Sequence, residues 1–178
     1  MTIFEHSFTL IGLVLGLALA EVLSGLVRTA RSRGVRALGV LTPLLAIFFV
    51  ADVATFWGIL WGLRTTLPDT IWPVLGMGIL LSSLYYIAAT LVFPGEREQA
   101  PDLDAYYMKS RRLVLGLMLL CFVTVTAIAS VRAGELTTDI VGVAYTIVLS
   151  ATILAPWKWA NIAGLSALIL VDIWAFFS

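Results

Sequence analysis

Long runs of apolar residues, separated by short polar breaks, make up most of the chain. Six runs are long and apolar enough to be membrane spans, at residues 8–27, 37–62, 71–93, 113–131, 140–156 and 160–177. A helix needs ~20 such residues, within a range of about 17–25, to cross the hydrocarbon core of a bilayer. The breaks contain Arg, Asp, Pro and Gly, which end helices and form turns. The pattern predicts an all-α polytopic membrane protein with six transmembrane helices in a single domain, residues 1–178.

The composition favours lipid as the main solvent of this surface. Hydrophobic residues make up 61% of the chain, charged residues 12%, and the mean hydropathy is +1.03. Soluble domains are roughly 45–50% apolar and about a quarter charged, and a domain of this size cannot bury such an excess. The chain has 11 basic and 11 acidic residues, so no basic surface for nucleic acid is expected. The expected partner is the lipid bilayer.

The basic residues predict which way the spans are oriented. All except Arg64 and Arg132 fall in the first, third and fifth breaks. These are Arg28, Arg31, Arg33, Arg36, Arg97, Lys109, Arg111, Arg112 and Lys158. Cytoplasmic loops of membrane proteins carry an excess of Lys and Arg. The odd-numbered breaks are therefore predicted to be cytoplasmic and both termini periplasmic.

The first apolar run has two interpretations. Ala18-Leu19-Ala20 resembles a signal-peptide cleavage site, but no basic residue precedes the run and the apolar sequence continues past it. We therefore expect a retained helix. Gly12, Gly16 and Ala20 recur every four residues, a spacing that permits close helix approach. The partner helix could belong to the same chain or to a second copy, so a homo-oligomer is one of the expectations.

The breaks also predict how the helices are connected. Short connections place consecutive helices side by side and antiparallel. The longest break, from Pro94 to Arg112, ends in DLDAYYMKSRR, where Asp102 can cap a helix. We expect this stretch to extend the fourth helix towards the cytoplasm.

Three carboxylates, Glu21, Asp52 and Asp172, fall inside the predicted spans. A charge at the centre of a bilayer costs ~2.5–3.5 kcal/mol on insertion scales, so such residues face the bundle interior, water or a partner. Counted from the predicted cytoplasmic ends, Asp52 and Asp172 differ in height by only about 5 Å. They can share a layer if the second and sixth helices touch. Glu21 belongs to another level, nearer the basic loops.

One interpretation of these acids is a pathway for protons or cations in a small channel or transporter. Hydroxyl groups that could support the pathway come from Ser82, Ser83, Tyr85, Tyr86, Thr124, Thr126 and Tyr145. The other interpretation is structural, because polar bonds between membrane helices are common. Ser82 or Ser83 would then bond to Asp52, and Tyr145 to Asp172. Ser24 and Arg28 would hold Glu21. The protein would be a non-catalytic scaffold or an accessory subunit of a larger membrane complex.

Side chains for catalysis or cofactor binding are scarce. His6 is the only histidine and Cys121 the only cysteine, which excludes an internal disulfide, zinc sites built on His and Cys, and haem held by two histidines. No lysine lies in mid-span for a retinal Schiff base. The contexts VADVA and LVDIW lack the signatures of intramembrane aspartyl proteases, and no nucleophile–base pair can be assembled. We expect no enzyme activity, no metal and no cofactor.

Two stretches carry a resemblance to known proteins. They are GLALAEVLSGLVR, residues 16–28, and SLYYIAATLVFPGEREQAPDLDAYYMKSRR, residues 83–112. They resemble an uncharacterised group of small multi-span bacterial inner-membrane proteins, which share the LVFP pattern, an acidic loop and a tyrosine-rich basic helix start. The resemblance implies a location in the bacterial inner membrane and transfers no functional residue.

Overall fold

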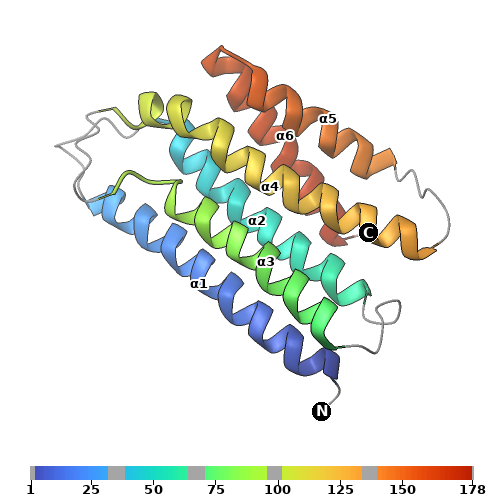
Figure 1. Cartoon of the computed structure of the whole chain (residues 1–178). Coiled ribbons are helices and arrows are strands. Elements are labelled where there is room, and N and C mark those ends of the chain that lie inside the picture. Colours follow the sequence, from blue (N-terminus) through green and yellow to red (C-terminus); the bar gives the residue numbers. More distant parts are fainter. Residues whose placement is uncertain (1–2, 32–38, 64–70, 96–101, 134–139, 178) are drawn as a thin grey trace.

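The chain folds into an up-and-down bundle of helices (Figure 1). The computed structural model describes residues 3–31, 39–63, 71–95, 102–133 and 140–177. These residues form α1 (Ile3–Arg31), α2 (Leu41–Gly62), α3 (Ile71–Thr90), α4 (Leu103–Ala133), α5 (Ile140–Leu154) and α6 (Lys158–Phe177). The odd-numbered helices run one way and the even-numbered helices the other. Both termini therefore lie towards the same end of the bundle, which we call the terminal end.

The six helices occupy the six predicted runs, and the differences lie at their ends. α4 begins at Leu103 rather than 113, which confirms the predicted extension of the fourth helix. Asp102 acts as the expected cap, because its Oδ1 accepts the backbone N–H of Asp104 at 2.9 Å. α2 begins at Leu41, four residues later than predicted and two residues after Gly39, whose φ of 53° favours glycine.

Five of the helices are long and apolar enough to cross a membrane, namely α1, α2, α3, α4 and α6. α5 has only 15 residues, a length of about 22 Å against the ~30 Å of a hydrocarbon core. The chain is thus an all-helical protein compatible with an integral membrane location. A sixth span formed by α5 and the outward orientation of the termini stay predictions.

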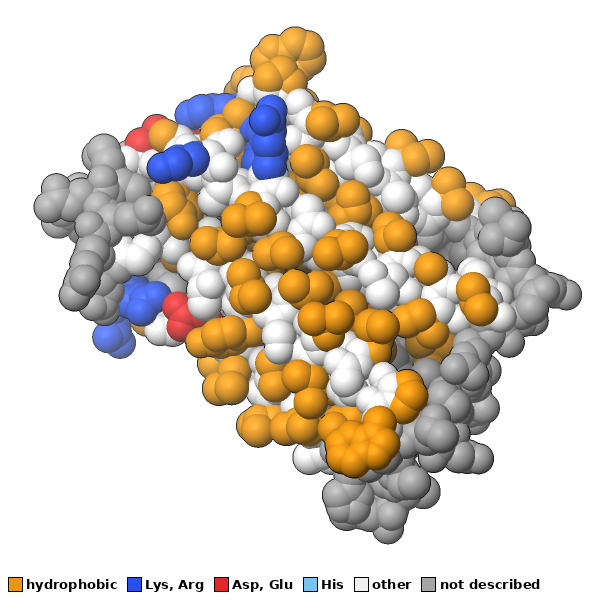
Figure 2. Space-filling model, viewed as in Figure 1, with side chains coloured by type: hydrophobic (Ala, Val, Ile, Leu, Met, Phe, Trp, Pro, Cys, Tyr) orange, Lys and Arg blue, Asp and Glu red, His pale blue; other side chains and the backbone are white. Residues whose placement is uncertain are grey.

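An apolar belt covers the middle of the bundle surface, as Figure 2 shows for one face. Leu13, Leu80, Ile147 and Leu170, each near the middle of a different helix, are all more than half exposed. Every basic side chain that the structure describes lies beyond this belt, at the end opposite the termini, which we call the basic end. These are Arg28, Arg31, Lys109, Arg111, Arg112 and Lys158. An exposed belt of this kind is what lipid would cover.

Packing departs from chain order at one point. α1 and α3 form the closest pair, and α2 packs on α1, α4 and α6. α2 and α3, although consecutive, meet mainly through long side chains, such as Phe49 and Tyr85 with ring centroids 5.9 Å apart. These two consecutive helices are therefore in contact, as expected, but their backbones approach each other less closely than those of the other consecutive pairs. A parallel partner suits α1 because Gly78 lets Ile11 approach α3, and Gly25 likewise accommodates Phe93.

The stripe of small residues on α1 is only partly used within the chain. Gly12 lies directly against the ring of Trp57 on α2. Gly16 has open space where its side chain would be, and Ala20 is exposed. The contact at Gly12 is therefore intramolecular, while the expectation of a homo-oligomer is untested by this arrangement.

Candidate functional site

Asp52 is the polar centre of the bundle. It lies in the middle of α2 and is only 4% exposed. Its Oδ2 accepts a hydrogen bond from the Tyr85 hydroxyl on α3 at 2.6 Å. Its Oδ1 accepts one from the Tyr145 hydroxyl on α5. Two donors from two other helices thus satisfy both oxygens of a buried carboxyl, as burial of such a group requires.

Each of these tyrosines is held by a phenylalanine. Phe56, one turn along α2 from Asp52, packs on Tyr85 with ring centroids 4.7 Å apart. Phe122 on α4 packs on Tyr145 with ring centroids 4.5 Å apart. Tilted aromatic pairs at such distances are stabilising. They fix the two phenol rings, and hence the hydroxyl groups, on either side of the Asp52 carboxyl.

Asp172, on α6, lies beside this centre and is 3% exposed. It interacts electrostatically with Asp52 and with the side chain of Thr55, one turn further along α2. Its Oδ2 is buried without a hydrogen-bond partner among the residues that the structure describes. Such a buried, unsatisfied oxygen is rare in native structures.

A pocket of about 600 Å³ contains both aspartates. Residues from α2, α3, α4, α5 and α6 form its wall. They include Val141 in the first turn of α5 and Phe176 in the last turn of α6, so the pocket lies at the terminal end of the bundle. Its wall is mostly apolar and aromatic, and the described part of that wall contains no basic residue.

The sequence prediction placed Asp52 and Asp172 at one level, as the structure does, but assigned them hydrogen-bond partners that the structure does not show. Asp52 and Asp172 share one pocket, as their similar heights suggested. Ser82 does not bond to Asp52, because its hydroxyl donates to the carbonyls of Gly78 and Ile79 on its own helix. Ser83, also proposed, is not a partner of Asp52 either.

Tyrosines replace the expected serines because of their reach. Tyr145, predicted to bond to Asp172, donates to Asp52. On α3, Tyr85 lies about four residues deeper than Asp52, or ~6 Å, when both are counted from the terminal end. Side chains lean towards the start of their helix, so this ring extends back towards the pocket. Comparison of backbone heights alone therefore missed Tyr85, although it was among the hydroxyl groups considered.

Glu21 lies apart from the two aspartates. It is on α1, which contributes no residue to the pocket, and 37% of its side chain is exposed. Its Oε1 forms the expected ion pair with Arg28, at 3.3 Å, near the basic end. The predicted difference in level is therefore correct, and the structure does not bring Glu21 into a chain with Asp52 and Asp172.

An apolar stretch of α6, which we call the dry layer, lies between the pocket and the basic end. Along the buried face of α6, Asn161 and Asp172 are separated by Leu165 and Leu168. Leu165 and Leu168 belong to the same buried hydrophobic core as Phe48, Leu115, Met118 and Leu149. The polar residues at Asn161 and Asp172 are about 16 Å apart along the helix, so the two ends of the interior are not joined by polar groups on this face.

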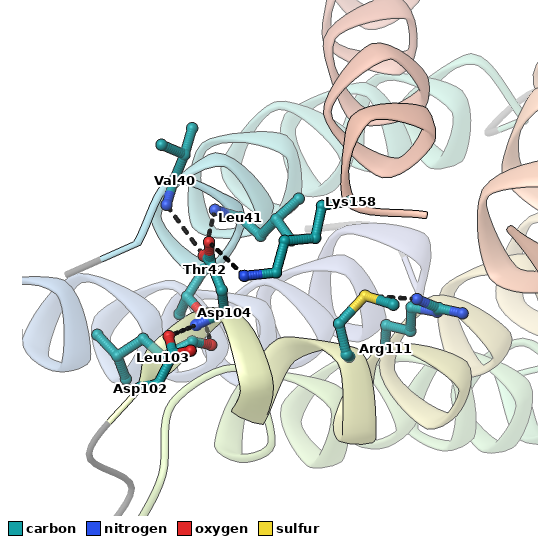
Figure 3. A network of polar contacts seen from close by, with 9 residues as sticks. Val40, Leu41, Thr42, Asp102, Leu103, Asp104, Arg111 and Lys158 are labelled. Atoms are coloured by element: carbon teal, nitrogen blue, oxygen red, sulfur yellow. Dashed lines mark hydrogen bonds and ion pairs between the residues drawn. The ribbon is translucent and has the colours of Figure 1, made fainter. Parts of the chain in front are cut away.

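The basic end is closed by its own polar contacts (Figure 3). Oδ1 of Asp104, on α4, accepts the backbone N–H groups of Val40 and Leu41, both at 3.0 Å, and so caps α2 from another helix. Its Oδ2 lies 3.7 Å from Nζ of Lys158 at the start of α6. Asp104 therefore joins the beginnings of three helices.

Two further contacts lie just below this closure. The Tyr107 hydroxyl donates to Oδ1 of Asn161 at 2.8 Å, which joins α4 to α6. One turn deeper on α4, Arg111 is 3% exposed, its Nη1 lies against the sulfur of Met108, and its Nε has no partner among the described residues.

The described residues contain no group of three or more His, Cys, Asp or Glu side chains that could hold a metal ion.

Comparisons of the chain with protein-family models, with curated proteins and with solved structures found no match.

Proposed function

We propose that this chain is an integral membrane protein that moves a proton or another cation across the bilayer, with Asp52 and Asp172 as its binding groups. The observation that supports this function is the meeting of two buried carboxyl groups from different helices in one pocket. Intramembrane carboxyl groups that face a cavity are a common device for proton and cation transfer. Glu21 has no part in the proposed route.

A transporter fits the described residues better than an open channel. The pocket lies at the terminal end, whereas the dry layer with Leu165 and Leu168 lies between it and the basic end. Buried Arg111 adds a permanent positive charge beyond that layer, which opposes entry of a cation from that side. A cation in the pocket could cross only after the helices around the layer rearranged, as in alternating access.

Flux into liposomes tests this function. Purified protein is reconstituted, and proton, sodium and potassium movement is followed with fluorescent indicators under a membrane potential. We expect flux of at least one cation for the wild type, and a loss of tenfold or more for Asp52→Asn and Asp172→Asn. Glu21→Gln is the matched control, because it removes an acid outside the pocket and should retain the wild-type flux.

Two results would count against the proposal. Wild-type liposomes that match protein-free liposomes for every cation would remove the transport function and favour the scaffold alternative. That alternative draws on the complete hydrogen bonding of Asp52 by Tyr85 and Tyr145, which a purely structural residue would also show. Flux that is unchanged in both aspartate variants would remove the two acids from the mechanism.

A further inference from the structure

The size of the pocket bears on what kind of cation it accepts. About 600 Å³ is far more than a proton or a dehydrated metal ion fills, and it lies within the range of sites for small organic molecules. Two carboxyl groups are also few for a metal, because calcium takes six to eight oxygen ligands and structural zinc four ligands. The pocket volume thus favours an organic cation over a proton or a bare metal ion.

One carboxyl oxygen in the pocket is available to accept a hydrogen bond. Both oxygens of Asp52 already accept hydrogen bonds, from Tyr85 and from Tyr145. Asp172 provides the remaining acceptor, because its Oδ2 has no partner among the described residues and the residue is only 3% exposed. An N–H group that donates to this oxygen would remove the cost of leaving it unsatisfied.

The rest of the wall is suited to the apolar part of a cation. Phe56, Phe122, Trp174 and Phe176 line the pocket together with the two tyrosines. Aromatic faces attract cations through their quadrupoles, more strongly where water is excluded, and they also bury apolar groups.

We propose that the pocket binds a small organic monocation of the amine class, with its ammonium group at Asp172 and its apolar body against Phe122 and the neighbouring rings. This inference rests on the proposed function, since it names the class of cation that the site accepts. Asp52, which accepts hydrogen bonds from Tyr85 and Tyr145, lines the pocket beside Asp172.

Ligand pairs on the unmodified protein give the sharpest test. Benzylammonium and benzyl alcohol have nearly the same shape and differ in charge. Binding of each to purified protein in detergent is measured by calorimetry, with protein-free micelles as the blank. We expect benzylammonium to bind at least tenfold more tightly than benzyl alcohol, and sodium or potassium at 100-fold excess to compete only weakly. Equal affinity for the charged and neutral compounds would overturn the proposal, and so would absence of benzylammonium binding.

Variants then locate the site. Asp172→Asn should weaken benzylammonium binding tenfold or more, and Phe122→Leu threefold or more, while Glu21→Gln should bind like the wild type. An Asp172→Asn protein that is folded and binds normally would place the ligand elsewhere and refute the assignment.

The outcomes for binding and for transport are separable. Cation flux that depends on Asp172, without benzylammonium binding, would leave the proposed function standing and end this inference. Benzylammonium binding that depends on Asp172, without any flux, would retain the site and end the transport function.

Discussion

Removal of one hydroxyl group tests the geometry on which the candidate site depends. Tyr85→Phe keeps the ring that packs on Phe56 and deletes the donor that lies 2.6 Å from Oδ2 of Asp52. The oxygen that loses its partner stays buried, because Asp52 is only 4% exposed. The change therefore removes a hydrogen bond and leaves an unsatisfied acceptor.

The size of the effect can be bounded from both sides. Hydrogen bonds to charged groups contribute ~1.5–3 kcal/mol in soluble proteins. Polar bonds between membrane helices average only ~0.6 kcal/mol and reach ~1.7, because the unfolded chain in the membrane finds other partners. Since the acceptor here is buried and cannot turn to water, we expect a loss of about 1–2 kcal/mol in the free energy of unfolding. This corresponds to a roughly 5–30-fold shift in the unfolding equilibrium.

Tyr86→Phe is the matched control for this measurement. Tyr86 is the next residue on α3, is 41% exposed and points away from the bundle, so the same chemical change should alter stability by less than about 0.5 kcal/mol. Unfolding of each variant is followed by circular dichroism in mixed micelles with an increasing fraction of denaturing detergent. A cycle with Asp52→Asn isolates the coupling between the two side chains. Equal stability of Tyr85→Phe and Tyr86→Phe would refute the role assigned to this bond.

Three other predictions concern the frame around the site. Asp104→Ala should lower the free energy of unfolding by about 1 kcal/mol in the same assay, because Oδ1 of Asp104 caps α2. Asp104→Asn keeps an oxygen that can accept these bonds and should be nearly as stable as the wild type. Equal stability of the two variants would argue against the cap. Gly164→Ala should lower the midpoint of thermal unfolding, since the added methyl group meets the side chain of Thr152. Gly16→Ala has open space around the added methyl group and should leave the midpoint unchanged or raise it. The reverse order of the two midpoints would contradict the helix packing. Reporter fusions at the two termini should both report the periplasm, and a cytoplasmic signal from either one would overturn the orientation taken from the basic residues.

If the chain transports a cation as proposed, the dry layer between the pocket and the basic end is where the helices would have to move. Leu165 and Leu168 are on α6, which packs on α2 and α5. Gly164, next to them, allows α6 to approach Thr152 of α5 closely. A small sliding of α6 along α5 would change the layer and move Lys158 relative to Asp104, while the two hydrogen bonds from Val40 and Leu41 to Asp104 do not involve α6.

The sequence by itself determined the class of fold and most of its elements. Continuous apolar runs can satisfy their backbone in lipid only as helices or closed barrels, and runs of this length favour helices. The start of α4 followed from Asp102, whose side chain caps a helix locally, and the ion pair of Glu21 with Arg28 followed from spacing on one helix face. Helix rise also placed Asp52 and Asp172 at similar heights, because it depends on chain position alone.

Only the tertiary structure decided which side chains meet around those two acids. α3 packs most closely against α1, and the Ser82 hydroxyl donates to its own helix, so neither Ser82 nor Ser83 bonds to Asp52 as expected. Tyr85 and Tyr145 reach it instead, since a phenol ring places its hydroxyl roughly one helical turn from its own backbone position. The rotation of each helix and the reach of its side chains depend on how the bundle packs. They cannot be predicted from an apolar run that is hydrophobic on every face, because such a run does not indicate which face points inward.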